Sequence, residues 1–107
     1  EGTGNTNGNF VYLGFQPAAL WIKNADNGGG DWQFFDNQRD LVNKDWATSL
    51  TPNSAAIETS SYKVDFLSNG FKMRDSTTHT NNSYTYFYCA WAENPFGGET
   101  AAPGTAR

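Results

Sequence analysis

Few residues in this sequence could catalyse a reaction. The chain has one histidine, His79, and one cysteine, Cys89, so a Ser-His-Asp or Cys-His arrangement would have to use them. His79 lies in a polar stretch typical of a solvated loop, and Cys89 falls in an apolar run, where a free cysteine behaves as a small buried hydrophobe. No pair among the eleven Asp and Glu residues is set apart as the acid and base of a glycosidase. We therefore predict that the chain is not an enzyme.

Oxygen ligands near a glycine-rich turn are the candidates for a metal site. Asp26 and Asp31 flank three consecutive glycines, with Asn24 and Asn27 close by. Such oxygens suit calcium, but their spacing fits neither an EF-hand nor a glycine-rich calcium repeat. The other interpretation is a tight loop closed by Asx turns. We predict no metal and no cofactor, and keep calcium at Asp26 and Asp31 as the alternative.

Aromatic side chains make up 16% of the residues and are the richest candidates for binding. Their faces stack on sugar rings while neighbouring Asp and Asn oxygens bind the hydroxyls, and aromatic residues also build protein cores and subunit contacts. Both interpretations stay open. The residues expected to contact a glycan or a protein partner are Trp32, Trp46, Tyr84, Tyr86 and Tyr88.

One pair of opposite charges is spaced to close a turn. Asp36 and Arg39 are three residues apart, directly after an apolar segment. A bridge between them would fix the chain where that segment ends. Arg39 stacked on Trp32 or Trp46 is an equally good interpretation.

The elements that must position these residues are short strands. Segments 10–15, 18–23 and 31–36 combine aromatic and aliphatic residues and are separated by Pro17 or by the glycine turn. The second and third of them predict a hairpin around that turn.

A second hairpin is predicted further along the chain. Segments 62–67 and 71–74 alternate apolar and polar residues around Ser68-Asn69-Gly70, where Asn-Gly readily supplies positive φ. Segment 84–92 is the longest strand candidate. Because both of its faces are partly apolar, it is expected to be a central strand.

Composition limits the class of protein further. The net charge is −4, and no two of the seven Lys and Arg residues are adjacent, so the basic footprint that nucleic acid binding needs is missing. No apolar run approaches the ~20 residues that span a bilayer. We predict neither nucleic acid binding nor membrane insertion.

Short strands with turns between them and no helical period favour an all-β fold. We predict an antiparallel β-sandwich, jelly-roll-like, with long polar loops; a barrel is the alternative. Residues 10–96 would form the domain, residues 1–9 a flexible lead-in and residues 97–107 an extended tail.

Three segments together resemble a domain of bacteriophage tail-fibre and other virion appendage proteins. They are residues 13–24 (LGFQPAALWIKN), residues 31–39 (DWQFFDNQR) and residues 84–96 (YTYFYCAWAENPF), with residues 66–71 (FLSNGF) between the last two. The resemblance covers residues 10–96 and rests on the order and spacing of these motifs.

The resemblance implies a virion structural protein on the particle surface, a C-terminal module that contributes to assembly and host attachment. It implies a homotrimer in contact with other virion proteins, and a host glycan as a possible receptor. It carries over no catalytic residue. A capsid decoration or head-fibre protein, and a free carbohydrate-binding module, are the alternatives.

Overall fold

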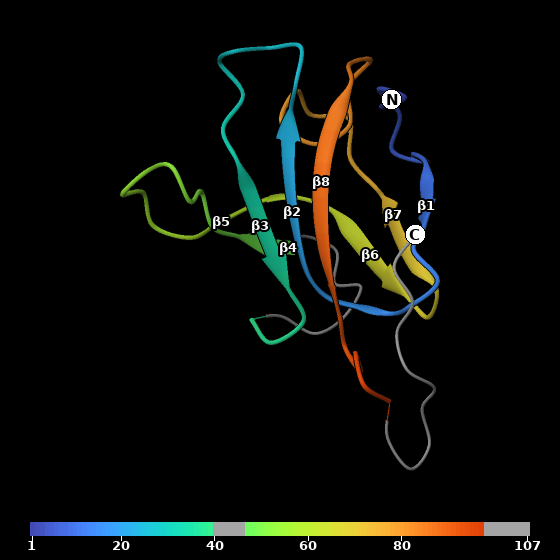
Figure 1. Cartoon of the computed structure of the whole chain (residues 1–107). Coiled ribbons are helices and arrows are strands. Elements are labelled where there is room, and N and C mark those ends of the chain that lie inside the picture. Colours follow the sequence, from blue (N-terminus) through green and yellow to red (C-terminus); the bar gives the residue numbers. More distant parts are fainter. Residues whose placement is uncertain (40–46, 98–107) are drawn as a thin grey trace.

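The computed structural model describes residues 1–39 and 47–97, and these residues form eight strands and no helix (Figure 1). They contain no helix long and apolar enough to cross a membrane. The strands are β1 (Phe10–Tyr12), β2 (Pro17–Asn24), β3 (Gln33–Asp36), β4 (Ala47–Ser49), β5 (Thr59–Tyr62), β6 (Val64–Leu67), β7 (Gly70–Met73) and β8 (Tyr86–Ala92).

Two three-stranded antiparallel sheets form the sandwich. One has the order β3-β2-β8, and the other has the order β1-β7-β6. Strands β4 and β5 form a separate pair, which joins the first sheet through the bridge between Phe34 and Leu50. In Figure 1, β3, β2 and β8 lie side by side, with β7 and β1 beyond β8. The expected all-β sandwich is confirmed.

Both predicted hairpins are present. Strands β2 and β3 pair antiparallel with Trp21 opposite Phe34, and β6 and β7 pair with Phe66 opposite Phe71. Asn24, at the end of β2, shapes the loop to β3, because its side-chain Oδ1 accepts hydrogen bonds from the backbone N–H groups of Asp26 and Asn27. The loop is therefore closed by an Asx turn.

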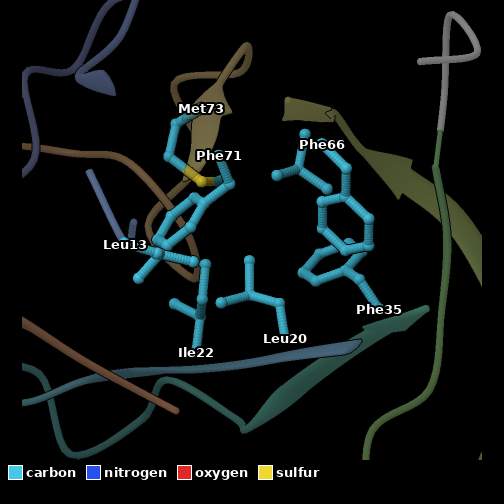
Figure 2. Close-up of a cluster of buried hydrophobic side chains, with 8 residues drawn as sticks. Leu13, Leu20, Ile22, Phe35, Phe66, Phe71 and Met73 are labelled. Atoms are coloured by element: carbon cyan, nitrogen blue, oxygen red, sulfur yellow. The ribbon is translucent and has the colours of Figure 1, made fainter. Parts of the chain in front are cut away.

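The core lies between the two sheets. Leu20 and Ile22 of β2 and Phe35 of β3 face Phe66, Phe71 and other apolar side chains of the second sheet (Figure 2). Leu20 is fully buried. Since alternate residues of a strand point to opposite faces, Trp21 and Phe34 point away from this core.

The expected central position of segment 84–92 is wrong within the described chain. Strand β8 pairs with β2 alone and lies at the edge of its sheet. Its second apolar face is an exposed surface, not a second buried layer. Cys89, expected to be buried, is exposed on that face.

Gly70 has a different role from the one predicted. The turn between β6 and β7 consists of Ser68 and Asn69, and Gly70 already belongs to β7. Gly70 does not have positive φ, unlike Gly14 at +81°. A Cβ atom on Gly70 would lie 2.0 Å from the backbone oxygen of Val11. Glycine is needed there because β1 approaches closely.

Residues 1–9 are held against the domain, although a flexible lead-in was expected. Gly2 N–H donates to Tyr84 O at 2.8 Å, and Gly4 N–H donates to Asn81 O at 2.9 Å. The buried Asn81 also donates from Nδ2 to Asn5 O at 2.8 Å. Of the expected tail 97–107, only Gly97 lies within the described residues.

Candidate binding face

The outer surface of the β3-β2-β8 sheet carries a cluster of aromatic side chains. Trp21 of β2 lies at its centre, with ring centroids 5.8 Å from Trp32, 5.9 Å from Phe34 and 6.0 Å from Trp91. All three contacts are edge-to-face, the arrangement that the ring quadrupoles favour. We use the name aromatic face for Trp21, Trp32, Phe34, Phe87 and Trp91.

Much of the aromatic face is open to solvent. The exposed fractions are 60% for Phe87, 50% for Trp91 and 36% for Trp21. Three large exposed rings on one sheet face are unusual, because stable monomers rarely gather exposed apolar residues in one place. The face is therefore the best candidate for contact with a partner.

Polar and charged side chains at the margin of the aromatic face form hydrogen bonds within the chain. Lys23 Nζ donates to Gly30 O at one end. Asn37 Nδ2 donates to a carboxylate oxygen of Glu93 at the other. Polar groups at the margin of an apolar centre are typical of protein interfaces.

Asp36 and Arg39 form the pair expected from their spacing. Arg39 Nε lies 2.7 Å from Asp36 Oδ2, and Asp36 Oδ1 accepts hydrogen bonds from the backbone N–H groups of Gln38 and Arg39 at 2.9 Å. The Arg39 guanidinium also contacts Glu58 and lies 5.8 Å from the ring centroid of Phe34. The arginine therefore stacks on Phe34, whereas stacking on Trp32 or Trp46 was the alternative considered.

The other predicted contact residues are not gathered on one surface. Trp32 belongs to the aromatic face, whereas Trp46 lies outside the described residues. Tyr88 points to the other side of β8 and packs edge-to-face on Phe71, with ring centroids 5.3 Å apart. Tyr86 O–H donates to Thr78 O at 2.9 Å and accepts from Asn82 N–H at 2.8 Å, so its ring anchors the loop before β8. Tyr84 is partly exposed.

Burial changes the ionisation of two tyrosines. It raises the pKa of Tyr86, the hydrogen bond from Asn82 opposes this rise, and Asp75 adds to it. Burial also raises the pKa of Tyr62, with a further contribution from Asp31. Both hydroxyls therefore stay protonated over the physiological pH range.

A cavity of about 350 Å³ opens between the edges of the two sheets. Phe10 and Tyr12 of β1 line one side, and Tyr86 and Tyr88 of β8 line the other, with Phe71 among the inner lining residues. Its polar lining consists of groups near the N-terminus and of Thr80 and Asn81. The cavity shows that the sandwich is less tightly closed between β1 and β8 than at its centre.

The calcium candidates take part in loop contacts. Asp26 Oδ2 accepts from the backbone N–H of Thr85 at 2.7 Å, a hydrogen bond that lowers the pKa of Asp26. Asp31 Oδ1 accepts from Asn53 Nδ2 at 2.8 Å. Residues 1–39 and 47–97 contain no group of three or more His, Cys, Asp or Glu placed to hold a metal ion.

His79 and Cys89, the residues considered as a catalytic base and a nucleophile, lie in different surroundings. His79 packs against the ring of Tyr62, with centroids 5.7 Å apart. Cys89 lies on the outer face, opposite Trp21 in the sheet register.

Sequence reasoning missed four members of the aromatic face as contact residues, namely Trp21, Phe34, Phe87 and Trp91. In an alternating strand, Trp21 points in the opposite direction to Leu20 and Ile22. Alternation also placed Phe87 and Trp91 on one face of their strand. Which face is buried depends on the position of the second sheet, and alternation alone does not report this.

Comparison with known proteins places the chain in a family but supplies no activity. No curated protein and no solved structure matches it. The model of the DUF7483 family, a domain of unknown function, matches residues 1–95. That range includes all eight strands of the sandwich. The chain therefore belongs to the DUF7483 family.

Proposed function

We propose that this chain is a non-catalytic structural and binding domain of a bacteriophage virion, part of a tail fibre or similar appendage that contributes to assembly and host attachment. The observation that carries the binding role is the aromatic face, with Phe87, Trp91 and Trp21 exposed at its centre. The virion assignment is supported by the resemblance of residues 13–24, 31–39 and 84–96 to appendage domains. These three segments contain β2, β3 and β8 and so build one sheet.

The local chemistry favours a role without catalysis. The side chains around the aromatic face are paired with one another, as Asp36 is with Arg39 and Asn37 with Glu93. A catalytic acid or base needs a polar group free to reach a substrate. Incubation of the oligomer with host polysaccharide is expected to release no reducing ends.

Labelling of intact particles tests the virion assignment. Antibodies raised against the 107-residue chain should decorate purified phage particles from the source culture when visualised with gold. Label at the tail tip supports an appendage, and label over the head indicates a capsid decoration or head-fibre protein. Particles without label, together with no peptide of this chain in their mass spectrum, contradict the proposal.

A glycan-binding module is the second candidate. It is favoured by a tryptophan ring beside amide and carboxylate groups, as the half-buried Trp32 is next to the Asp31–Asn53 hydrogen bond. The edge-to-face packing of Trp21, Trp32 and Trp91 gives no flat platform of several rings, so one ring at most would stack on a sugar. A glycan array with hits that Trp91→Ala abolishes supports this candidate, and an array without hits removes it.

A further inference from the structure

We propose that the outer side of β8, centred on Cys89, is the surface on which a second copy of this chain docks. The inference rests on the proposed function, because it names the partner of the aromatic face. It follows from the edge position of β8, from the composition of that strand, and from the charges around it.

The free edge of β8 is the first observation. Just before β8, Ala25 N–H donates to Thr85 O, so these two residues form a hydrogen-bonded pair. Along an antiparallel ladder, every second residue of a strand bonds to the same neighbouring strand. Phe87 and Cys89 therefore bond to β2, and the peptide groups of Tyr86, Tyr88 and Ala90 point away from it. Upstream of β8 this edge is covered by Gly2, which bonds to Tyr84 O. From Tyr86 to Ala92, no strand of the described residues covers it.

The composition of β8 is the second observation. Edge strands are usually protected from pairing by charged residues, by proline or by a bulge. The seven residues of β8, YFYCAWA, include no charge and no proline. The only register shift along β8 lies at its end, opposite Pro17 and Ala19. At the other end of the sheet, β3 is covered through the bridge between Phe34 and Leu50.

The third observation, the charge around β8, fits another copy as the partner. Where two identical surfaces meet across a symmetry axis, charges close to the axis meet their own sign, so an uncharged centre favours contact between copies. At the margin of the aromatic face, Arg39 is paired with Asp36 and Glu58, and Lys23 donates a hydrogen bond to a backbone oxygen. The centre of the face is uncharged, and so is Cys89, which lies opposite Trp21 on the same side of the sheet.

The size of the patch fits the centre of an interface. Three rings exposed to 60%, 50% and 36% present about 300 Å² of aromatic surface. A stable interface buries about 800 Å² on each partner, with an apolar centre and a polar rim. The free edge of β8 and the polar margin of the face would supply the rest of that area. A rotation axis close to Cys89, twofold or threefold, brings the copies of Phe87, Cys89 and Trp91 together.

Charge substitution at Cys89 tests this arrangement. Cys89→Lys places a positive charge at the proposed axis, and Cys89→Ser is the matched neutral control. Light scattering over a dilution series of the 107-residue chain should show an oligomer for the natural sequence and for Cys89→Ser. Cys89→Lys should raise the dissociation constant by more than about a hundredfold. Circular dichroism should show both variants folded. A monomeric natural chain, or an oligomer unchanged by Cys89→Lys, overturns the proposal.

A second pair of variants does not depend on Cys89. Trp91→Thr removes an exposed ring from the aromatic face. Ile57→Thr is the matched control, because it shortens a side chain that is 86% exposed in the connection between β4 and β5. Trp91→Thr should weaken the oligomer about tenfold or more, and Ile57→Thr should leave it unchanged. Equal weakening by both substitutions contradicts docking at β8.

Two readouts locate the contact. Mild oxidation of the natural oligomer should join Cys89 to Cys89 of another copy, and failure to do so overturns the position of the axis.

The amides of Tyr86, Tyr88 and Ala90 should exchange hydrogen slowly in the oligomer and quickly in the Cys89→Lys monomer. Slow exchange in that monomer means that the chain covers its own edge, and it overturns the proposal. Particle labelling is independent of all these readouts, so the virion assignment can fail while self-association holds, and the reverse.

Discussion

At the scale of single residues, buried polar groups connect the loops to the sandwich. Asp75 is 5% exposed. Its Oδ2 accepts from Lys63 N–H at 2.9 Å, and its Oδ1 accepts from Thr77 N–H at 3.0 Å and from Thr80 Oγ1. No buried side-chain nitrogen or oxygen in the described part of the chain lacks a partner.

Asp75→Asn should therefore destabilise the fold. The new amide NH₂ group faces an N–H or O–H donor, so at least one buried donor loses its acceptor, at a cost of about 1–3 kcal/mol. Asp65→Asn is the control, because Asp65 forms a partly exposed ion pair with Arg74 at 3.3 Å, and such pairs contribute about 0–1 kcal/mol. Urea unfolding compares the two variants. Equal losses would contradict the role assigned to the Asp75 network.

Ionisation of Tyr86 makes the stability of the fold depend on pH in the alkaline range. Burial raises its pKa above the ordinary value of 10.0, so in the folded chain the hydroxyl keeps its proton to higher pH than in the unfolded chain. The resulting stabilisation is complete below pH 10 and is lost as the pH rises through the folded pKa. Stability measured by urea unfolding should fall between neutral pH and about pH 11.

Tyr86→Phe should reduce that fall without abolishing it, because the pKa of Tyr62 is raised as well. At neutral pH the variant should lose about 1–2 kcal/mol, since Tyr86 O–H forms two hydrogen bonds to the loop before β8. A pH profile identical to that of the natural chain would show that Tyr86 does not titrate as described.

At the scale of elements, the pairing of β1 with β7 depends on a close backbone approach. Gly70→Ala would place a Cβ atom 2.0 Å from Val11 O, so β1 must move away or lose its pairing. The expected cost is about 2–4 kcal/mol. Gly28→Ala is the matched control, because a Cβ atom there meets no atom within 4 Å. Thermal unfolding should separate the two variants clearly, and equal transition temperatures would contradict the close approach.

Elements with local signals could be predicted from the sequence, and their partners in space could not. Alternating residues and turn residues predicted the β2–β3 and β6–β7 hairpins, and the three-residue spacing of Asp36 and Arg39 predicted their bridge. The edge position of β8 depends on pairing between Trp21 and Cys89, 68 residues apart in the chain. An apolar second face indicates either a buried strand or an exposed binding strand, and the two have the same local pattern. The aromatic face was therefore only partly predicted, through Trp32.

At the scale of the whole molecule, the sandwich has one well-covered side and one open side. Strands β4 and β5 extend the first sheet beyond β3. On the opposite side, β8 and β1 border the cavity between the sheets. An assembly that covers β8 and the aromatic face would close the open side. This arrangement links the proposed role in a virion to a specific surface of the domain.

A density map of the intact phage particle, at a resolution that separates strands, tests this account most directly. The account predicts that the DUF7483 domain lies in an appendage on the particle surface, with Phe87, Cys89 and Trp91 of neighbouring copies in contact. A map in which the domain is present but β8 and the aromatic face lie in solvent would contradict the docking surface. A map of the complete particle without the domain would contradict the virion role.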